Sequence, residues 1–363
     1  MTTLQNLPRD RSVKRRLVTT TALFTGALVA LALLPLTLPL ALVVDLIRRR
    51  QWSTLRTTFF LTFFLCFEAF GLLILFKHWL HHKLGGLDDE AYEQANREMQ
   101  HWWVRGFFTT CLRTFSVRLS VDGLSALDDR RPALIYSRHA STLDTLIPMA
   151  LLDRPKRLRY TLKEALLYDP ALDYCGQRLP NVFVRRGSQN RQREVQKVIA
   201  LADDLGDDDA VVLFPEGTRF SDNKRARLLE KFDDDPQMLP VVQSLSNTLP
   251  PLRQGAIELI KAAPDADLVL ISHRGIEDAV SMADLLGGHL TGAHLQVRSW
   301  RIPASHIPRT DDAIRQFLVH QWQRVDAFAT DQPLGPLYPD SDHQRSAAQP
   351  DSRAQPTPAP ANP

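Results

Sequence analysis

The stretch PALIYSRHASTLDTLIP, residues 132–148, places a histidine and an aspartate directly after an apolar run. The run at 132–137 is typical of a buried strand, and residues 142–152 are typical of a helix that begins after a polar turn. On a continuous helix, two positions five residues apart lie about 140° apart around the axis. His139 and Asp144 can therefore meet only if His139 lies in the turn. The pattern predicts an imidazole at the carboxyl edge of a sheet, where open α/β folds place their sites.

The spacing also predicts how the two side chains interact. Asp144, one turn into the helix, would accept a proton from one ring nitrogen of His139, and the other nitrogen would be left to accept a proton from a hydroxyl group. Ser141 is the expected N-cap of the helix. The sequence has no GxSxG elbow and no cysteine nearby, which favours direct transfer to an incoming hydroxyl. Alone, the spacing is a weak signal, because a histidine after a strand is more often structural.

Strand and helix patterns alternate along the middle of the chain. The expected strands are 117–123, 132–137, 157–163, 181–186, 210–217 and part of 267–274, and the expected helices are 88–116, 142–152, 164–169 and 192–206. This order predicts one α/β domain over residues 85–330, with a mostly parallel sheet flanked by helices.

Two apolar stretches precede this domain, at 17–47 and 57–76, and both reach the roughly 20 residues that a membrane span needs. They predict a membrane-anchoring helical hairpin over residues 17–84, after a basic cytoplasmic N-terminus, residues 1–16. Basic residues flank both stretches, and Pro35 and Pro39 interrupt the first. Two true spans and a proline-bent, re-entrant or monotopic hairpin therefore both stay open.

Composition narrows the other possibilities. The net charge of +3 gives no argument for a nucleic-acid partner. Three cysteines without CxxC spacing argue against a disulfide framework or a zinc site, and each is expected to be a small buried residue. Residues 331–363 are rich in proline and poor in large apolar residues, so a disordered tail is predicted there.

Two further strands are followed by arginines. PEGTR (215–219) would expose Glu216, Thr218 and Arg219 around Gly217, and NVFVRRG (181–187) ends in two arginines. Guanidinium and backbone N–H groups at such an edge suit a phosphate or another polar group of a substrate. The alternative interpretation is a solvated basic loop.

Together these motifs resemble those of the glycerolipid acyltransferase family, typified by 1-acylglycerol-3-phosphate (lysophosphatidate) acyltransferase. The resemblance covers about residues 117–275. It implies that His139 is the catalytic base and Asp144 its partner. It also implies that the acceptor is bound or oriented by the remaining site residues, which are Lys163, Arg186, Glu216, Gly217, Thr218 and Arg219.

The sequence departs from the family pattern at several positions. Arg138 stands where asparagine is frequent, and Arg185 stands where an acidic residue is common. A fourth block, LPPLRQGA (249–256), is followed by ISHRG (271–275) in place of a proline-centred strand end. A charged insert at 220–248 is expected to contact the headgroup or the acyl donor.

The resemblance implies a membrane-bound O-acyltransferase whose partners are the phospholipid bilayer, a lysophospholipid acceptor and an acyl donor. The donor would be acyl-CoA or acyl carrier protein, and the expected acceptor is 1-acyl-sn-glycerol-3-phosphate, giving phosphatidic acid. No metal and no other cofactor are expected, and the domain would face the cytoplasm from the inner membrane. The alternatives are transfer to glycerol 3-phosphate or another lysolipid, a non-catalytic lipid-binding scaffold, and a metal-dependent hydrolase that uses His139, Asp144 and His273.

Overall fold

A seven-stranded sheet forms the centre of the protein. The computed structural model describes residues 10, 12–49, 51–185, 189–251, 254–279 and 281–338. The strands lie in the order β1-β7-β6-β2-β5-β3-β4. Their bounds are β1 Arg118–Asp122, β2 Ala133–Ser137, β3 Arg157–Lys163, β4 Val182–Val184, β5 Asp209–Leu213, β6 Asp267–Arg274 and β7 His294–Ile302. All neighbouring pairs are parallel except β6 with β7. The predicted mostly parallel α/β fold is confirmed.

The register brings two segments to one edge. Tyr136 in β2 lies opposite Leu213 in β5 and Leu270 in β6. β2 and β5 therefore end at nearly the same level, whereas β6 continues to Arg274, and the segments that follow β2 and β5 meet at the carboxyl edge. That edge carries both the RHASTLD and the PEGTR motifs.

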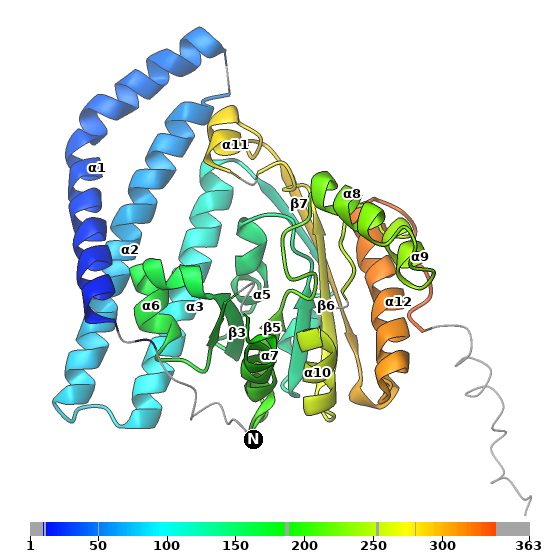
Figure 1. The fold of residues 1–363 in the computed structure, drawn as a ribbon. Coiled ribbons are helices and arrows are strands. Elements are labelled where there is room, and N and C mark those ends of the chain that lie inside the picture. Colours follow the sequence, from blue (N-terminus) through cyan, green and yellow to red (C-terminus); the bar gives the residue numbers. More distant parts are fainter. Residues whose placement is uncertain are drawn as a thin grey trace, which may run out of the picture.

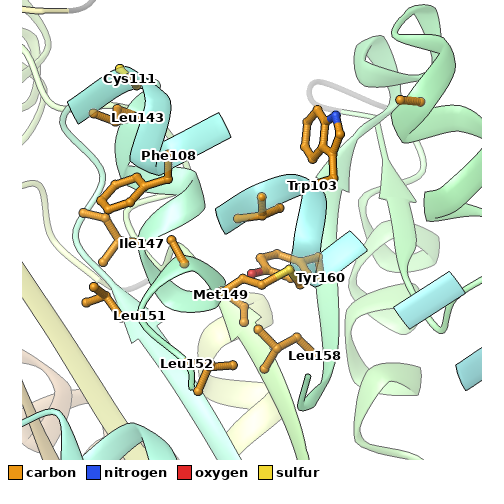
Figure 2. Packing of buried hydrophobic residues seen from close by; sticks show 14 of the residues in the cluster. Trp103, Phe108, Cys111, Leu143, Ile147, Met149, Leu151, Leu152, Leu158 and Tyr160 are labelled. Carbon is orange, nitrogen blue, oxygen red and sulfur yellow. The ribbon is translucent and has the colours of Figure 1, made fainter. Parts of the chain in front are cut away.

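Helices cover both faces of the sheet (Figure 1). Alternate residues of β2 point to opposite faces. Ile135 belongs to an apolar cluster with residues of α3 (Asp89–Thr114), whereas Leu134 and Tyr136 belong to a second cluster with residues of α10 and α12. Figure 2 shows the first cluster, in which Phe108 of α3 lies beside Ile147 of the short helix α5, and Trp103 of α3 lies on the side of Tyr160 in β3. The helices other than α1, α2 and α3 are α4 Ser125–Asp128, α5 Ile147–Ala150, α6 Pro170–Gly176, α7 Arg191–Ile199, α8 Asp222–Lys231, α9 Met238–Gln243, α10 Gln254–Ala262, α11 Met282–Gly287 and α12 Asp311–Ala329.

The two apolar stretches form a helical hairpin beside the domain. Helix α1 spans Val13–Arg48, and α2 spans Ser53–Lys83. Both are long and apolar enough to cross a membrane, and α1 leaves many large apolar side chains exposed. Pro35 and Pro39 lie inside α1 without ending it, and Figure 1 shows this helix bent.

Two sequence predictions need correction. The helix expected over 142–152 is a 3₁₀ helix, Leu143–Leu146, followed by the short α5. Pro148 has no N–H group to donate to the carbonyl of Asp144, which accepts from Ile147 instead, and this i+3 bond belongs to the 3₁₀ helix. Ser141 is not the residue that precedes the 3₁₀ helix, although its Oγ does accept a hydrogen bond from the Leu143 N–H.

The start of the predicted tail is ordered. Leu337 accepts a hydrogen bond from Gln321 of α12, and the Tyr338 ring stacks on His306. These contacts cover apolar side chains at the end of the second cluster. The predicted boundary at 331 therefore lies too early, and residues 339–363 are outside the described part of the chain.

Candidate active site

The backbone of His139 is held by the loop that follows β5. Its N–H donates to Glu216 Oε1 at 3.0 Å, and its carbonyl accepts from the Phe220 N–H at 2.7 Å. Just before it, the Arg138 N–H donates to Ile271 of β6. Motifs that are about 80 residues apart in sequence thus fix the position of one turn.

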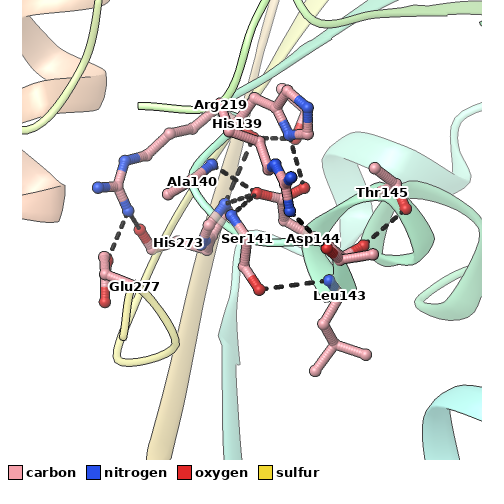
Figure 3. Close-up of polar contacts among 12 residues, drawn as sticks. His139, Ala140, Ser141, Leu143, Asp144, Thr145, Arg219, His273 and Glu277 are labelled. Atoms are coloured by element: carbon pink, nitrogen blue, oxygen red, sulfur yellow. Dashed lines mark hydrogen bonds and ion pairs between the residues drawn. The ribbon is translucent and has the colours of Figure 1, made fainter. Parts of the chain in front are cut away.

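Asp144 binds the ring of His139 directly (Figure 3). The distance from His139 Nδ1 to Asp144 Oδ1 is 2.9 Å, and Asp144 Oδ2 accepts the N–H groups of Ala140 and Ser141, each at 2.6 Å. Burial of Asp144 opposes ionisation, but the hydrogen bonds from its two histidine neighbours outweigh it and hold the pKa of Asp144 well below its usual range. An ionised carboxylate only accepts, so Nδ1 of His139 carries the proton and Nε2 is an acceptor.

The acceptor nitrogen of His139 remains available. Among the described residues, Nε2 has no hydrogen-bond partner, and it is not one of the fully enclosed unpaired atoms. The side chain is only 6% exposed, and the Phe214 ring lies 4.8 Å from it between centroids. A substrate hydroxyl must therefore approach along a narrow route to the Nε2 edge of the ring.

A second imidazole lies behind the carboxylate. His273, at the end of β6, is fully buried, with Nε2 3.4 Å from Asp144 Oδ2 and 3.3 Å from the Arg138 carbonyl. The Nδ1 atom of His273 is buried without a hydrogen-bond partner in the described part of the chain. From the sequence, His273 was expected only as a ligand in the metal-dependent alternative. His273 lies close to Asp144 because β2 pairs with β6, and this pairing cannot be predicted from the local sequence.

Arg138 is also buried, at the position where the family often has asparagine. Its Nη1 donates to the His273 carbonyl and to Glu277 Oε1, each at 2.6 Å, and Nη2 donates to the Asn247 carbonyl at 2.9 Å. The guanidinium thus ties the turn after β2 to the end of β6. This departure from the family pattern has a structural explanation.

Glu216 is not exposed, contrary to the sequence prediction. It is 2% exposed, and its second oxygen accepts the Leu249 N–H at 2.8 Å. Burial raises the pKa of Glu216 to about 8, against the opposing effect of the two backbone N–H donors. Gly217, at φ 70°, makes the turn that follows. We conclude that Glu216 braces the turn of His139, a role that its sequence position did not reveal.

Arg219 and Thr218 are partly exposed near the turn. Arg219 Nη1 donates to Thr142 Oγ1 at 2.6 Å, which places its guanidinium beside the segment between His139 and Asp144 (Figure 3). Lys224 of α8 donates to Thr218 Oγ1 and to the Arg219 carbonyl. The insert at 220–248, which forms α8 and α9, therefore adds a cation at this place.

The remaining predicted residues lie farther along the sheet. Lys163 ends β3, and β5 separates β3 from β2, so Lys163 is about 10 Å from the strand of His139. Arg185 follows β4 and forms an ion pair with Glu164. Arg186 lies outside the described residues, and so do Gly187 and Arg253.

These features define an α/β acyltransferase, and the sequence agrees: residues 118–278 match the family model described as Acyltransferase. The match supports an assignment to the glycerolipid acyltransferase family. A similar solved structure is that of the 1-acyl-sn-glycerophosphate (LPA) acyltransferase PlsC from Thermotoga maritima. The TM-score is 0.53 at 14% sequence identity, over 77% of this chain and 98% of that chain, which shows a common fold. No curated protein matches the sequence significantly.

Proposed function

We propose that this protein transfers a fatty acyl group from acyl-CoA or acyl carrier protein to the hydroxyl of a lysophospholipid. The proposed acceptor is 1-acyl-sn-glycerol-3-phosphate, and the product is phosphatidic acid. The observation that carries the proposal is the pairing of His139 with an ionised Asp144, which leaves Nε2 of His139 as an available acceptor.

The chemistry follows from that pairing. Nε2 of His139 takes the proton of the acceptor hydroxyl as its oxygen attacks the thioester carbonyl carbon. Asp144 stabilises the imidazolium that forms and keeps the ring oriented. The tetrahedral intermediate then collapses with cleavage of the C–S bond. The sulfur leaves as a thiol after it takes the proton from the imidazolium, so His139 returns to its starting state.

The acceptor phosphate is proposed to bind arginine. Arg219 supports this, because its guanidinium lies beside the catalytic turn, with Thr142 as a hydrogen-bond partner. Guanidinium groups recognise phosphate through paired N–H donors. Arg186 is the second proposed phosphate ligand and Lys163 a third group near the acceptor, both on the family resemblance alone.

The protein is proposed to work at the cytoplasmic face of the inner membrane. The support is the apolar hairpin of α1 and α2, which exposes large aliphatic side chains to its surroundings. Such a surface is stable in contact with acyl chains and unfavourable in water. It would hold the site at the bilayer surface, where the lysolipid acceptor resides.

The test is acyl transfer by purified protein to a panel of lysolipids and glycerol 3-phosphate, with products identified by mass. His139→Ala should lower the rate by at least about 100-fold, the usual contribution of a general base, while membrane association stays unchanged. Equal, measurable rates in the variant and the wild type would reject His139 as the base, whereas rates no higher than background in both would favour a lipid-binding scaffold. Activity that disappears with a chelator would instead favour the metal-dependent hydrolase.

A further inference from the structure

A largely apolar cavity of about 660 Å³ lies where the hairpin meets the α/β domain. It shares no lining residue with the candidate active site. Its walls come from one face of α1, the last turns of α2, and α3 and α6. The lining residues are Arg16, Thr20, Phe24, Leu72, Leu73, Leu75, Phe76, Trp79, His82, Lys83, Tyr92, Tyr174, Gln177 and Arg178.

The cavity continues into the exposed apolar surface of the hairpin. Leu73, Phe76 and Trp79 line it and are 54%, 57% and 40% exposed, so its mouth opens between apolar side chains. If the hairpin is embedded in lipid as proposed above, an acyl chain can enter without crossing water. The volume is of the size that accommodates lipid-like ligands.

Positive charge gathers at this cavity. The Arg16 guanidinium lies over the Tyr174 ring and is paired with Asp173, which also binds Arg15. Arg178 donates to the Leu75 carbonyl and to the side-chain oxygen of Asn96. Within the described residues neither Arg178 nor Lys83 has an ion pair. The charged side chains at this cavity therefore carry a net positive charge.

Two polar atoms of the cavity wall lack partners. Gln177 is 8% exposed, and its Oε1 atom is buried without a hydrogen bond, as is Oγ1 of Thr20, within the described part of the chain. A buried, unpaired oxygen is costly, so each is expected to be satisfied in the functional state. The Thr20 hydroxyl can donate to an ester oxygen of a lipid, whereas Gln177 Oε1 only accepts and needs a donor such as a hydroxyl group of a glycerol headgroup.

We propose that this cavity binds one anionic phospholipid of the bilayer, with an acyl chain between α1 and α2 and the phosphate at Arg178 and Lys83. This site is separate from acyl transfer, although it rests on the proposed membrane association. It would fasten the hairpin to the domain from within the lipid.

The test uses full-length protein from vesicles of phosphatidylcholine and phosphatidylglycerol in equal amounts. After extraction in detergent, native mass spectrometry measures the lipid retained on each protein. Wild type should retain one phosphatidylglycerol, in about tenfold excess over phosphatidylcholine, because the choline cation of phosphatidylcholine is repelled by the positive charge at the cavity. Equal retention of the two lipids, or retention of neither, would overturn the proposal.

Two variants locate the bound lipid. Leu73→Trp blocks the mouth of the cavity, and Arg178→Gln removes the cation; each should retain about tenfold less phosphatidylglycerol. Leu46→Trp is the matched control, because Leu46 is 59% exposed on α1 and does not line the cavity; it should retain the lipid. His139→Ala should also retain it, which separates this result from loss of acyl transfer. Full retention by Leu73→Trp would contradict the site.

Discussion

At the scale of single residues, Asp144 is surrounded by nitrogen atoms. His139 Nδ1 lies at one oxygen, and two backbone N–H groups and His273 Nε2 lie at the other. The backbone donors fix the carboxylate in space, because they belong to the same rigid turn. His273 is different, because it approaches from β6 and its contribution can be removed without changing the turn.

We therefore expect His273→Leu to lower kcat about tenfold with little change in KM, as for a lost hydrogen bond to a charged group. Without that donor, Asp144 interacts more strongly with the imidazolium of His139. The acidic limb of the pH–rate profile should then move to higher pH, which a purely structural effect would not produce. His273→Gln offers an N–H donor again and should recover part of the rate. A profile unchanged in position would contradict a positioning role.

Glu216 gives a prediction for stability. Burial raises its pKa from an ordinary value of 4.5 to about 8 in the folded protein. Between these values the folded state holds more protons than the unfolded state, so its contribution to the free energy of unfolding falls as the pH rises. The stability of wild type relative to Glu216→Gln should therefore decrease from about pH 5 to about pH 9, measured by thermal unfolding in detergent. A constant difference would contradict this.

At the scale of secondary structure, the sequence predicts those strands whose residues form a recognisable local pattern. The six predicted strands are all present, because each is an apolar run bounded by turn residues. Strand β7 was not predicted, since the polar Ser299 occupies an inward position of its alternation. Its Arg298 and Arg301 form ion pairs with Asp122 and Asp267, which are distant in sequence. The same limit applies to the site. His139 and Asp144 are close in sequence, whereas the contacts of Glu216 and His273 depend on strand pairing.

The turn between α1 and α2 is held by hydrogen bonds to Asp45, which the sequence did not predict. Asp45 interrupts the first apolar stretch, and in the structure it is 2% exposed. Its two oxygens accept the N–H groups of Thr54 and Leu55 at 3.0 and 2.9 Å. These are among the N–H groups at the start of α2 that have no partner within the helix.

Asp45→Ala should therefore destabilise the protein by about 1 kcal/mol, as for loss of a helix cap. Asp45→Asn keeps an acceptor oxygen and should lose less. Thermal unfolding of the two variants in the same detergent measures the difference. An equal loss in both would assign the effect to the charge of Asp45 rather than to its hydrogen bonds.

At the scale of the whole molecule, both ends of the hairpin contact the α/β domain. At the turn, Ser53 Oγ donates to the Leu286 carbonyl of α11 at 3.1 Å. Near the other end, Arg178, in the turn after α6, donates to the Leu75 carbonyl of α2 at 2.8 Å. These two points on α2 are about 33 Å apart along the helix axis, more than the roughly 30 Å thickness of the hydrocarbon core.

A domain on one side of a bilayer cannot contact α2 at both points if α2 crosses the membrane. We therefore predict that the hairpin lies in one leaflet, with its turn on the same side as the domain. In a cysteine-free background, Gln51→Cys at the exposed turn and Ser305→Cys in the domain should react with a membrane-impermeant maleimide from the same face of sealed vesicles. If the helices span the membrane, the two positions will be labelled from opposite faces, and the contact between Ser53 and α11 cannot form in the bilayer.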